Sequence, residues 1–284
     1  MRQDRRRLLA ALCAAGLASP VAVHARPPRR VVSVGGAVTE IVYALGAGER
    51  LVGTDSTSVF PAAAQKLPRV GYMRQISAEG VLSLKPEIVV ATAEAGPPAV
   101  LTQIEAAGVP IRRLSVRHSS ESLRDNIREI VGVLGMTEEG RRLVAELDVH
   151  WSQTARRVAS LANRPRVLFI LAHGGGVPMV SGAGTAADAM IGYAGAVNAV
   201  QGVDGYKPLT AEAAIASAPD VILITSQGLE ETGGLDRLLA RPGLSLTPAG
   251  RDRHVVAMDS LYLLGFGPRL PAAVADLAER LRKS

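Results

Sequence analysis

Residues 77–92 read SAEGVLSLKPEIVVAT, and residues 210–225 read TAEAAIASAPDVILIT. Both stretches begin with a hydroxyl residue that suits a helix N-cap, continue through Ala and Glu into a short helix, and pass through Pro and an acid into an apolar strand. Four of the sixteen positions are identical. Favourable capping explains the hydroxyl and the Glu of each copy, but it does not explain the match along the rest of the stretch. The repeat therefore predicts two related lobes.

Strands and helices alternate on both sides of each copy of the repeat. Thr39 is expected to cap the first helix, which Gly46 closes. This alternation predicts an α/β fold with a mainly parallel sheet in each half. We expect strands at 30–34, 51–55, 87–91, 109–114, 166–171, 221–225 and 254–258, and further helices at 77–84, 98–107, 119–134, 185–194, 211–218 and 270–282.

Residues 137–163 have a different pattern, which is that of one long helix. The stretch contains no proline, its only glycine is Gly140, and Glu138 and Glu139 stand at its start, where the helix dipole favours acids. Such a helix would be about 40 Å long. We therefore expect a first lobe over 26–136, a connector helix over 137–163 and a second lobe over 164–284, with the ligand site in the crevice between the lobes.

Residues 1–25 are expected to be a cleaved signal peptide. Four arginines in the first seven residues precede the apolar run 8–23, and Val23-His24-Ala25 suits a cleavage site. The run is short and holds Pro20, so a membrane anchor is the weaker interpretation. Residues 5–9 (RRRLL) also admit a twin-arginine signal, and the general and twin-arginine export routes both stay open.

Removal of this leader lowers the net charge of the chain and removes its only cysteine. The formal charge falls from +6 to +3, because four arginines and one aspartate are lost, and the basic balance is therefore not interpreted as nucleic-acid binding. Cys13 is the only cysteine, and Leu12 before it disfavours lipidation. The mature chain then has neither disulfides nor thiolate metal sites.

The sequence lacks the sets of residues that enzymes of the main secreted classes require. Residues 173–176 read HGGG after a predicted strand, as in the oxyanion loop of esterases, but no Gly-x-Ser-x-Gly nucleophile turn occurs anywhere. Residues 182–187 match the dinucleotide fingerprint only in isolation. The four mature histidines are too dispersed for a zinc or manganese site: His118, His150, His173 and His254. A secreted enzyme is therefore kept only as an alternative to a non-catalytic binding protein.

The most specific motif is Gly71-Tyr72-Met73-Arg74, which precedes the first copy of the repeat. The ordinary pKa of a phenol is near 10, and both ferric iron and a nearby guanidinium favour the phenolate. Tyr72 with Arg74 can thus provide a hard anionic ligand for ferric haem. An ordinary half-buried tyrosine is the alternative, and three other phenols stay open as ligands: Tyr193, Tyr206 and Tyr262.

The sequence resembles the haem-binding members of the periplasmic binding protein family that also serves cobalamin and siderophores. The likeness lies in residues 70–91 (VGYMRQISAEGVLSLKPEIVVA), 171–200 (LAHGGGVPMVSGAGTAADAMIGYAGAVNAV) and 263–269 (LLGFGPR), and it extends over nearly all of the mature chain. The resemblance implies two Rossmann-like lobes joined by one long α-helix, the class III arrangement. It also implies a monomeric carrier in the periplasm, with cobalamin or a ferric siderophore as the alternative ligand.

The resemblance further implies roles for particular residues. Tyr72 is expected to ligate the haem iron with support from Arg74, and His173 to ligate a second, stacked haem. Glu79 and Glu212, the glutamates of the two repeat copies, are expected to dock on the inner-membrane permease of an ABC importer with its ATPase subunits. An outer-membrane haem uptake system would supply the ligand, and nucleic acid is not an expected partner.

Overall fold

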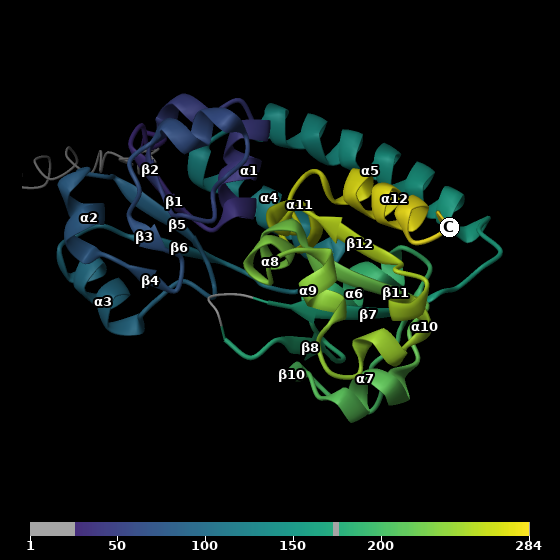
Figure 1. The fold of residues 1–284 in the computed structure, drawn as a ribbon. Coiled ribbons are helices and arrows are strands. Elements are labelled where there is room, and N and C mark those ends of the chain that lie inside the picture. Colours follow the sequence, from purple (N-terminus) through teal and green to yellow (C-terminus); the bar gives the residue numbers. More distant parts are fainter. Residues whose placement is uncertain (1–25, 173–175, 284) are drawn as a thin grey trace, which may run out of the picture.

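The first lobe is built on a parallel four-stranded sheet. The computed structural model describes residues 26–172 and 176–283. The strand order is β2-β1-β5-β6, and all three pairings are parallel, as the alternation predicts. Helices lie on both faces of the sheet (Figure 1). The strands are β1 (Val31–Val34), β2 (Leu51–Thr54), β5 (Ile88–Thr92) and β6 (Ile111–Leu114), and the helices are α1 (Gly36–Ala44), α2 (Ala78–Ser83), α3 (Pro98–Ala106) and α4 (Ser120–Leu134).

The second lobe has a mixed sheet with a parallel centre. The order is β10-β8-β7-β11-β12, and β9 also pairs with β7. Strands β7, β11 and β12 are parallel, whereas β8 runs antiparallel to β7 and β10 antiparallel to β8. The strands are β7 (Arg166–Leu171), β8 (Met179–Ser181), β9 (Val197–Asn198), β10 (Tyr206–Pro208), β11 (Val221–Thr225) and β12 (Val255–Met258). The helices are α6 (Ala186–Tyr193), α7 (Ala211–Ser217), α8 (Ser226–Glu231), α9 (Leu235–Leu239), α10 (Pro248–Arg251), α11 (Ser260–Leu264) and α12 (Leu270–Arg280).

The repeat has the same local structure in both lobes. The Ser77 hydroxyl accepts a hydrogen bond from the backbone N–H of Gly80, and the Thr210 hydroxyl accepts one from Ala213. Helices α2 and α7 therefore begin as predicted. Each leads into a strand at the centre of its sheet, and all five residues of β11 are buried. Burial on both faces explains why these strands are continuous apolar runs.

Thr39 does not cap the first helix, so that prediction is wrong. Helix α1 begins three residues earlier, after Gly35, whose φ of 109° is a conformation that favours glycine. The Thr39 hydroxyl is buried and forms hydrogen bonds with Ser33 Oγ at 2.7 Å and Ser58 Oγ at 2.6 Å. It thus ties the helix to the sheet and to the loop after β2.

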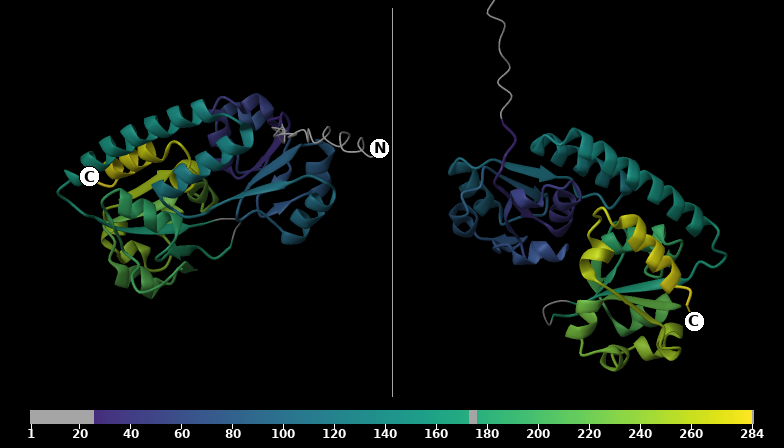
Figure 2. Two further views of the ribbon diagram at one scale, coloured as in Figure 1. Left: turned by 180° about the vertical axis from the view of Figure 1, so that it is seen from behind. Right: turned by 90° about the horizontal axis from the view of Figure 1, so that it is seen from above.

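The connector is helix α5 (Thr137–Ala159), which crosses from the first lobe to the second along one side of the molecule (Figures 1 and 2). It packs against α4 of the first lobe and α12 of the second. It ends at Ala159 rather than at 163, and Ser160 is its C-cap. The described helix is about 35 Å long.

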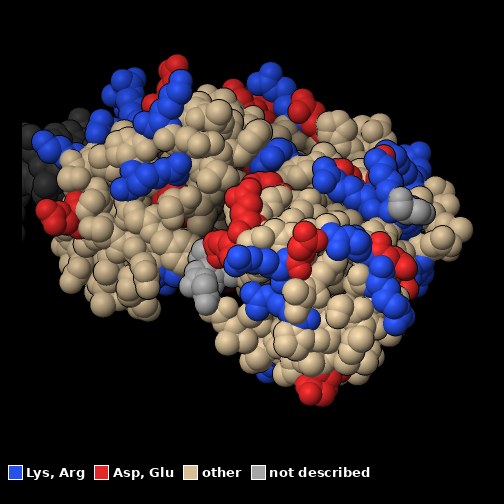
Figure 3. All heavy atoms as spheres, viewed as in Figure 1, with Lys and Arg blue, Asp and Glu red and all other residues tan. Residues whose placement is uncertain are grey.

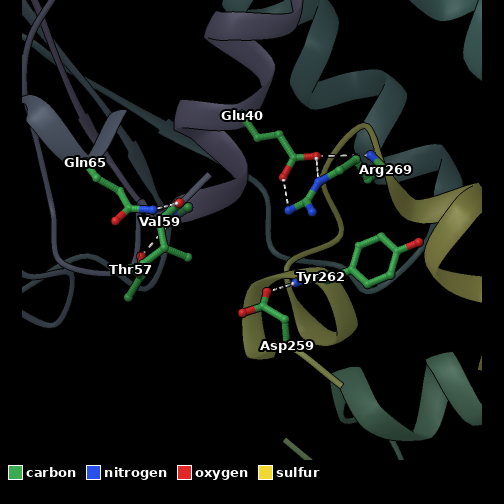
Figure 4. Close-up of polar contacts among 8 residues, drawn as sticks. Glu40, Thr57, Val59, Gln65, Asp259, Tyr262 and Arg269 are labelled. Carbon is green, nitrogen blue, oxygen red and sulfur yellow. Dashed lines mark hydrogen bonds and ion pairs between the residues drawn. The ribbon is translucent and has the colours of Figure 1, made fainter. Parts of the chain in front are cut away.

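A buried ion pair also joins the lobes. Arg269, at the start of α12, donates from Nε to Glu40 Oε1 at 3.0 Å and from Nη2 to Oε2 at 2.9 Å, and its backbone N–H donates to Oε1 at 3.1 Å. Glu40 lies on α1, and its side chain is only 5% exposed. Figure 4 shows the two side chains meeting between the lobes. The pair therefore holds α1 and α12 at a fixed separation.

Replacing Arg269 with Ala should lower the free energy of unfolding. Glu40 would stay buried without a cation, and removal of one member of a part-buried pair of this kind costs about 2–4 kcal/mol. Urea unfolding followed by circular dichroism measures the change. Arg141→Ala is the control, because Arg141 and its partner Glu138 are both largely exposed and should contribute under about 1 kcal/mol. Equal losses in the two variants would contradict the assignment.

Candidate functional site

The loops that follow the parallel strands of the first lobe meet at one edge of its sheet and face the second lobe. Such an edge is where open α/β sheets bind ligands. Two contacts place it against the other lobe. Phe60, after β2, lies under the Arg269 guanidinium at 3.7 Å from the ring centroid, and His118, after β6, lies 5.2 Å from the Phe266 ring. The space-filling view shows the surface hollowed between the lobes (Figure 3).

Tyr72 lies on a tight hairpin rather than on an irregular loop. The hairpin consists of β3 (Gly71–Tyr72) and β4 (Gln75–Ile76), with Tyr72 opposite Gln75. Gly71 has a φ of 113°, and a Cβ atom there would lie 2.6 Å from the carbonyl oxygen of Gln75. Ile76 is buried and anchors the hairpin, whereas Tyr72 is 38% exposed. The hairpin therefore presents the phenol to solvent on a restrained backbone.

Arg74 is in the turn of this hairpin, where it binds Glu94. Its Nη2 donates to Glu94 Oε1 at 2.7 Å. This hydrogen bond is the main cause that raises the pKa of Arg74, partial burial opposes it, and the charges of Glu94 and Tyr72 add to it. The sequence predicted that Arg74 supports Tyr72. In the structure Arg74 forms its hydrogen bond and ion pair with Glu94, a residue that sequence analysis did not single out.

Tyr206 of β10 belongs to the second lobe and lies within electrostatic range of Glu94 and Arg74. Burial is the main cause that raises the pKa of the Tyr206 phenol, and a hydrogen bond with Thr185 acts in the opposite direction. The charges of Glu94 and Arg74 also act on this pKa, which places Tyr206 within electrostatic reach of the hairpin. Arg74 is thus within electrostatic range of a phenol from each lobe, Tyr72 and Tyr206.

His118 lies at the same edge of the first-lobe sheet, and the sequence did not indicate it as a site residue. It is half-buried on the loop between β6 and α4, and its ring is tilted by 50° against Phe266. Burial lowers the pKa of His118, and the charge of Glu94 partly opposes that shift. The imidazole is therefore mainly neutral at pH 7. Over residues 26–172 and 176–283, no group of three or more His, Cys, Asp or Glu side chains is arranged to hold a metal ion.

The other two candidate phenols, Tyr193 and Tyr262, make contacts that support the fold. The Tyr193 hydroxyl accepts a hydrogen bond from the backbone N–H of Ser120 at 3.3 Å, and the ring packs edge-on against Trp151 of the connector at 4.8 Å. The Tyr262 ring lies 5.0 Å from the Arg269 guanidinium, and its backbone N–H donates to Asp259 (Figure 4). Burial is the main cause that raises the pKa of Tyr262. Both tyrosines therefore take part in joining or ordering the lobes.

Glu79 and Glu212 occupy matching places. Each is the second residue of its helix, α2 or α7, and each side chain is exposed. Helix α2 lies at the outer end of the first lobe and α7 at the outer end of the second (Figure 1). Among the described residues, neither glutamate has an ion-pair partner. His173 lies outside the described residues.

Comparisons with known proteins give consistent results. A family model described as periplasmic binding protein matches residues 31–262. The periplasmic haem-binding protein BhuT, solved in complex with two haems, is 50% identical, covers 89% of this chain and 97% of its own, and superposes with a TM-score of 0.85. The periplasmic haem-binding protein RhuT from Roseiflexus sp. RS-1, in apo form, is 43% identical with the same coverage and a TM-score of 0.87.

A curated relative has a different named ligand. The vitamin B12-binding protein of Vibrio vulnificus is 24% identical over 91% of this chain and 92% of its own. No helix in the described part of the chain is both long enough and apolar enough to cross a membrane. The match of the family model over most of the chain and the likeness to BhuT over nearly the whole of both chains lead to one conclusion: the chain belongs to the periplasmic binding protein family.

Proposed function

We propose that this protein binds ferric haem between its two lobes and delivers it to the permease of an ABC importer. The observation that carries the proposal is the likeness to solved haem-binding proteins, at 50% and 43% identity over 89% of the chain. The helical connector and the two α/β lobes give the arrangement that such a carrier requires. The family consists of substrate-binding proteins, so the function is carriage and not catalysis.

Cobalamin is the alternative ligand, because relatives named as vitamin B12-binding proteins match most of the chain. Their identity over that length is 24%, about half the value for BhuT. A cobalamin carrier has no need of an exposed phenol next to an arginine. The Tyr72–Arg74 hairpin therefore favours haem.

In this proposal Tyr72 supplies the iron ligand. Its phenol is 38% exposed on a restrained hairpin, so an incoming iron atom reaches it without a change of fold. Ferric iron and the cation of Arg74 together favour the phenolate over the phenol. Tyr206 and His118, which both lie within electrostatic range of Glu94, add aromatic rings near the hairpin, which suits a flat apolar macrocycle. His173 remains a predicted second ligand.

The protein acts in the periplasm, where residues 1–25 would have directed it as a cleaved signal peptide. Its partner is an inner-membrane permease with ATPase subunits, and an outer-membrane haem uptake system stands upstream. Glu79 and Glu212 supply the docking charges. A two-fold symmetric permease requires the same charge from each lobe, and matching positions at the start of α2 and α7 meet that requirement.

Replacing Tyr72 with Phe should remove the tyrosinate charge-transfer band of the ferric complex. The ring stays but the ligating oxygen is lost, so Kd should rise at least about tenfold, which corresponds to 1.4 kcal/mol. Visible spectra and a ferric haem titration measure both effects. Tyr262→Phe is the matched control and should leave the band unchanged. A band that survives in Tyr72→Phe and disappears in Tyr262→Phe would move the ligand to the other phenol.

Titration of the wild type with ferric haem should saturate near two haems per chain, and His173→Ala should reduce this number to one. The reason is that each stacked haem would take one ligand, from Tyr72 or from His173. His150→Ala is the control, because this histidine is exposed on the connector. Saturation of the wild type at one haem would refute the role of His173.

Changing both Glu79 and Glu212 to Lys should leave haem binding intact and strongly reduce uptake into vesicles that contain the permease. Like charges would then meet across the interface, and docking charges control association more than retention. Each change also loses a favourable helix-dipole contact, worth about 0.3–1 kcal/mol, so folding is checked by circular dichroism. Glu105→Lys with Glu146→Lys makes the same change in net charge at exposed positions of α3 and α5. Normal uptake by a folded, haem-loaded Glu79/Glu212 variant would exclude the docking role.

A further inference from the structure

We propose that Glu94 is an internal competitor for Arg74, which weakens the hold of the protein on its ligand and thereby speeds release. The inference rests on the proposed function, because it concerns an anionic ligand bound next to Tyr72. It assigns a role to a residue that neither the sequence motif nor the family resemblance indicates.

The position of Glu94 relative to Arg74 is set by the backbone. The loop between β5 and α3 lies against the hairpin, where Gly96 donates from N–H to the Met73 carbonyl at 3.0 Å and accepts from the Ile76 N–H at 2.9 Å. These bonds hold the two ends of the 2.7 Å ion pair side by side. The carboxylate is thus built into the support of the Tyr72 hairpin, unlike a surface acid on a free side chain.

The charge of Glu94 extends into the space between the lobes. It acts on His118 of its own lobe and on Tyr206 of the other, as well as on Arg74. A carboxylate in this place repels both an anionic phenolate and the carboxylates of a haem. It also occupies one of the donors of the Arg74 guanidinium that would otherwise turn toward the ligand.

The small free energy of the Arg74–Glu94 ion pair suits a residue that adjusts the affinity for the ligand. Both side chains are about half exposed, at 54% for Arg74 and 41% for Glu94, so the pair is held weakly and its donors can be exchanged. A ligand that covers the pair removes water and strengthens every remaining charge interaction, including the repulsion from Glu94. A carrier must release its cargo, and a fixed negative charge beside the ligand favours release.

If Glu94 only positions Arg74, its replacement should change the release rate and Kd in the opposite direction. The two roles can therefore be distinguished by experiment. If Glu94 served only to orient Arg74 for the ligand, its loss would weaken binding and speed release. If Glu94 competes, its neutralisation strengthens binding and slows release. Glu94→Gln keeps the size of the side chain and removes only the charge.

The experiment measures the rate at which the protein releases ferric haem to excess apomyoglobin. Glu94→Gln should slow release about 2- to 5-fold and lower Kd by a similar factor, a change of the size expected when the charge of an exposed pair is removed. Glu129→Gln is the matched control, because Glu129 pairs with Arg112 at a similar exposure of 44% on the outer side of the lobe. Its release rate should equal that of the wild type.

A double-mutant cycle tests whether the effect passes through Arg74. In an Arg74→Ala background, Glu94→Gln should change the release rate by less than half as much, because only the direct repulsion between Glu94 and the ligand is then lost and no guanidinium is freed. Unchanged or faster release in Glu94→Gln would overturn the proposal, and so would an equal effect in both backgrounds. A wild type that binds no ferric haem would instead overturn the proposed function itself. Because both residues are exposed, circular dichroism should show the native fold in every variant.

Discussion

The ion pair between Glu40 and Arg269 is the constraint on which the arrangement of the two lobes depends. A carboxylate that is only 5% exposed loses most of its hydration, and it is tolerated because three donors of one residue meet its two oxygens. Phe60 and Tyr262 stack on the same guanidinium, one from each lobe. The pair therefore sets the distance between α1 and α12. The connector helix packs against α12 as well, so both restraints act on how the second lobe lies against the first.

The two arginines of the cleft differ in a way that relates to their function. Arg269 is bound to a buried carboxylate through two parallel bonds, which suits a permanent structural contact. Arg74 is bound to an exposed carboxylate through one bond and sits on a small hairpin. A buried pair is costly to break, whereas an exposed pair is exchanged for little free energy. The structure thus contains one cation that is fixed between the lobes and one whose exposed ion pair is exchanged easily, as the proposed role of Arg74 requires.

The cleft wall draws on loops that lie far apart in the chain. The hairpin with Tyr72, the loop with Glu94 and the loop with His118 all lie at the carboxyl edge of one parallel sheet, and Tyr206 and Phe266 approach from the second lobe. Parallel topology brings these loops together, because every strand of the sheet ends at the same edge. The scaffold is rigid and the loops carry the chemistry, which is how one fold serves ligands as different as haem and cobalamin.

Local patterns were sufficient to predict the parallel strands and the longer helices in their order. They did not predict the short strands β3, β4 and β8–β10 or the helices α8–α11. The hydroxyl caps of α2 and α7, the apolar runs of β1, β5, β7 and β11, and the long helical stretch after residue 136 all depend on neighbours within a few residues. The Tyr72–Arg74 motif is also local, because its two residues lie two positions apart in the chain. The tertiary structure alone decided that Thr39 binds Ser33 and Ser58 instead of capping a helix, that Glu94 holds Arg74, and that Arg269 pairs with a residue 229 positions away. Periodicity and capping act through local hydrogen bonds, whereas these contacts depend on where the chain returns in space, which no local pattern encodes.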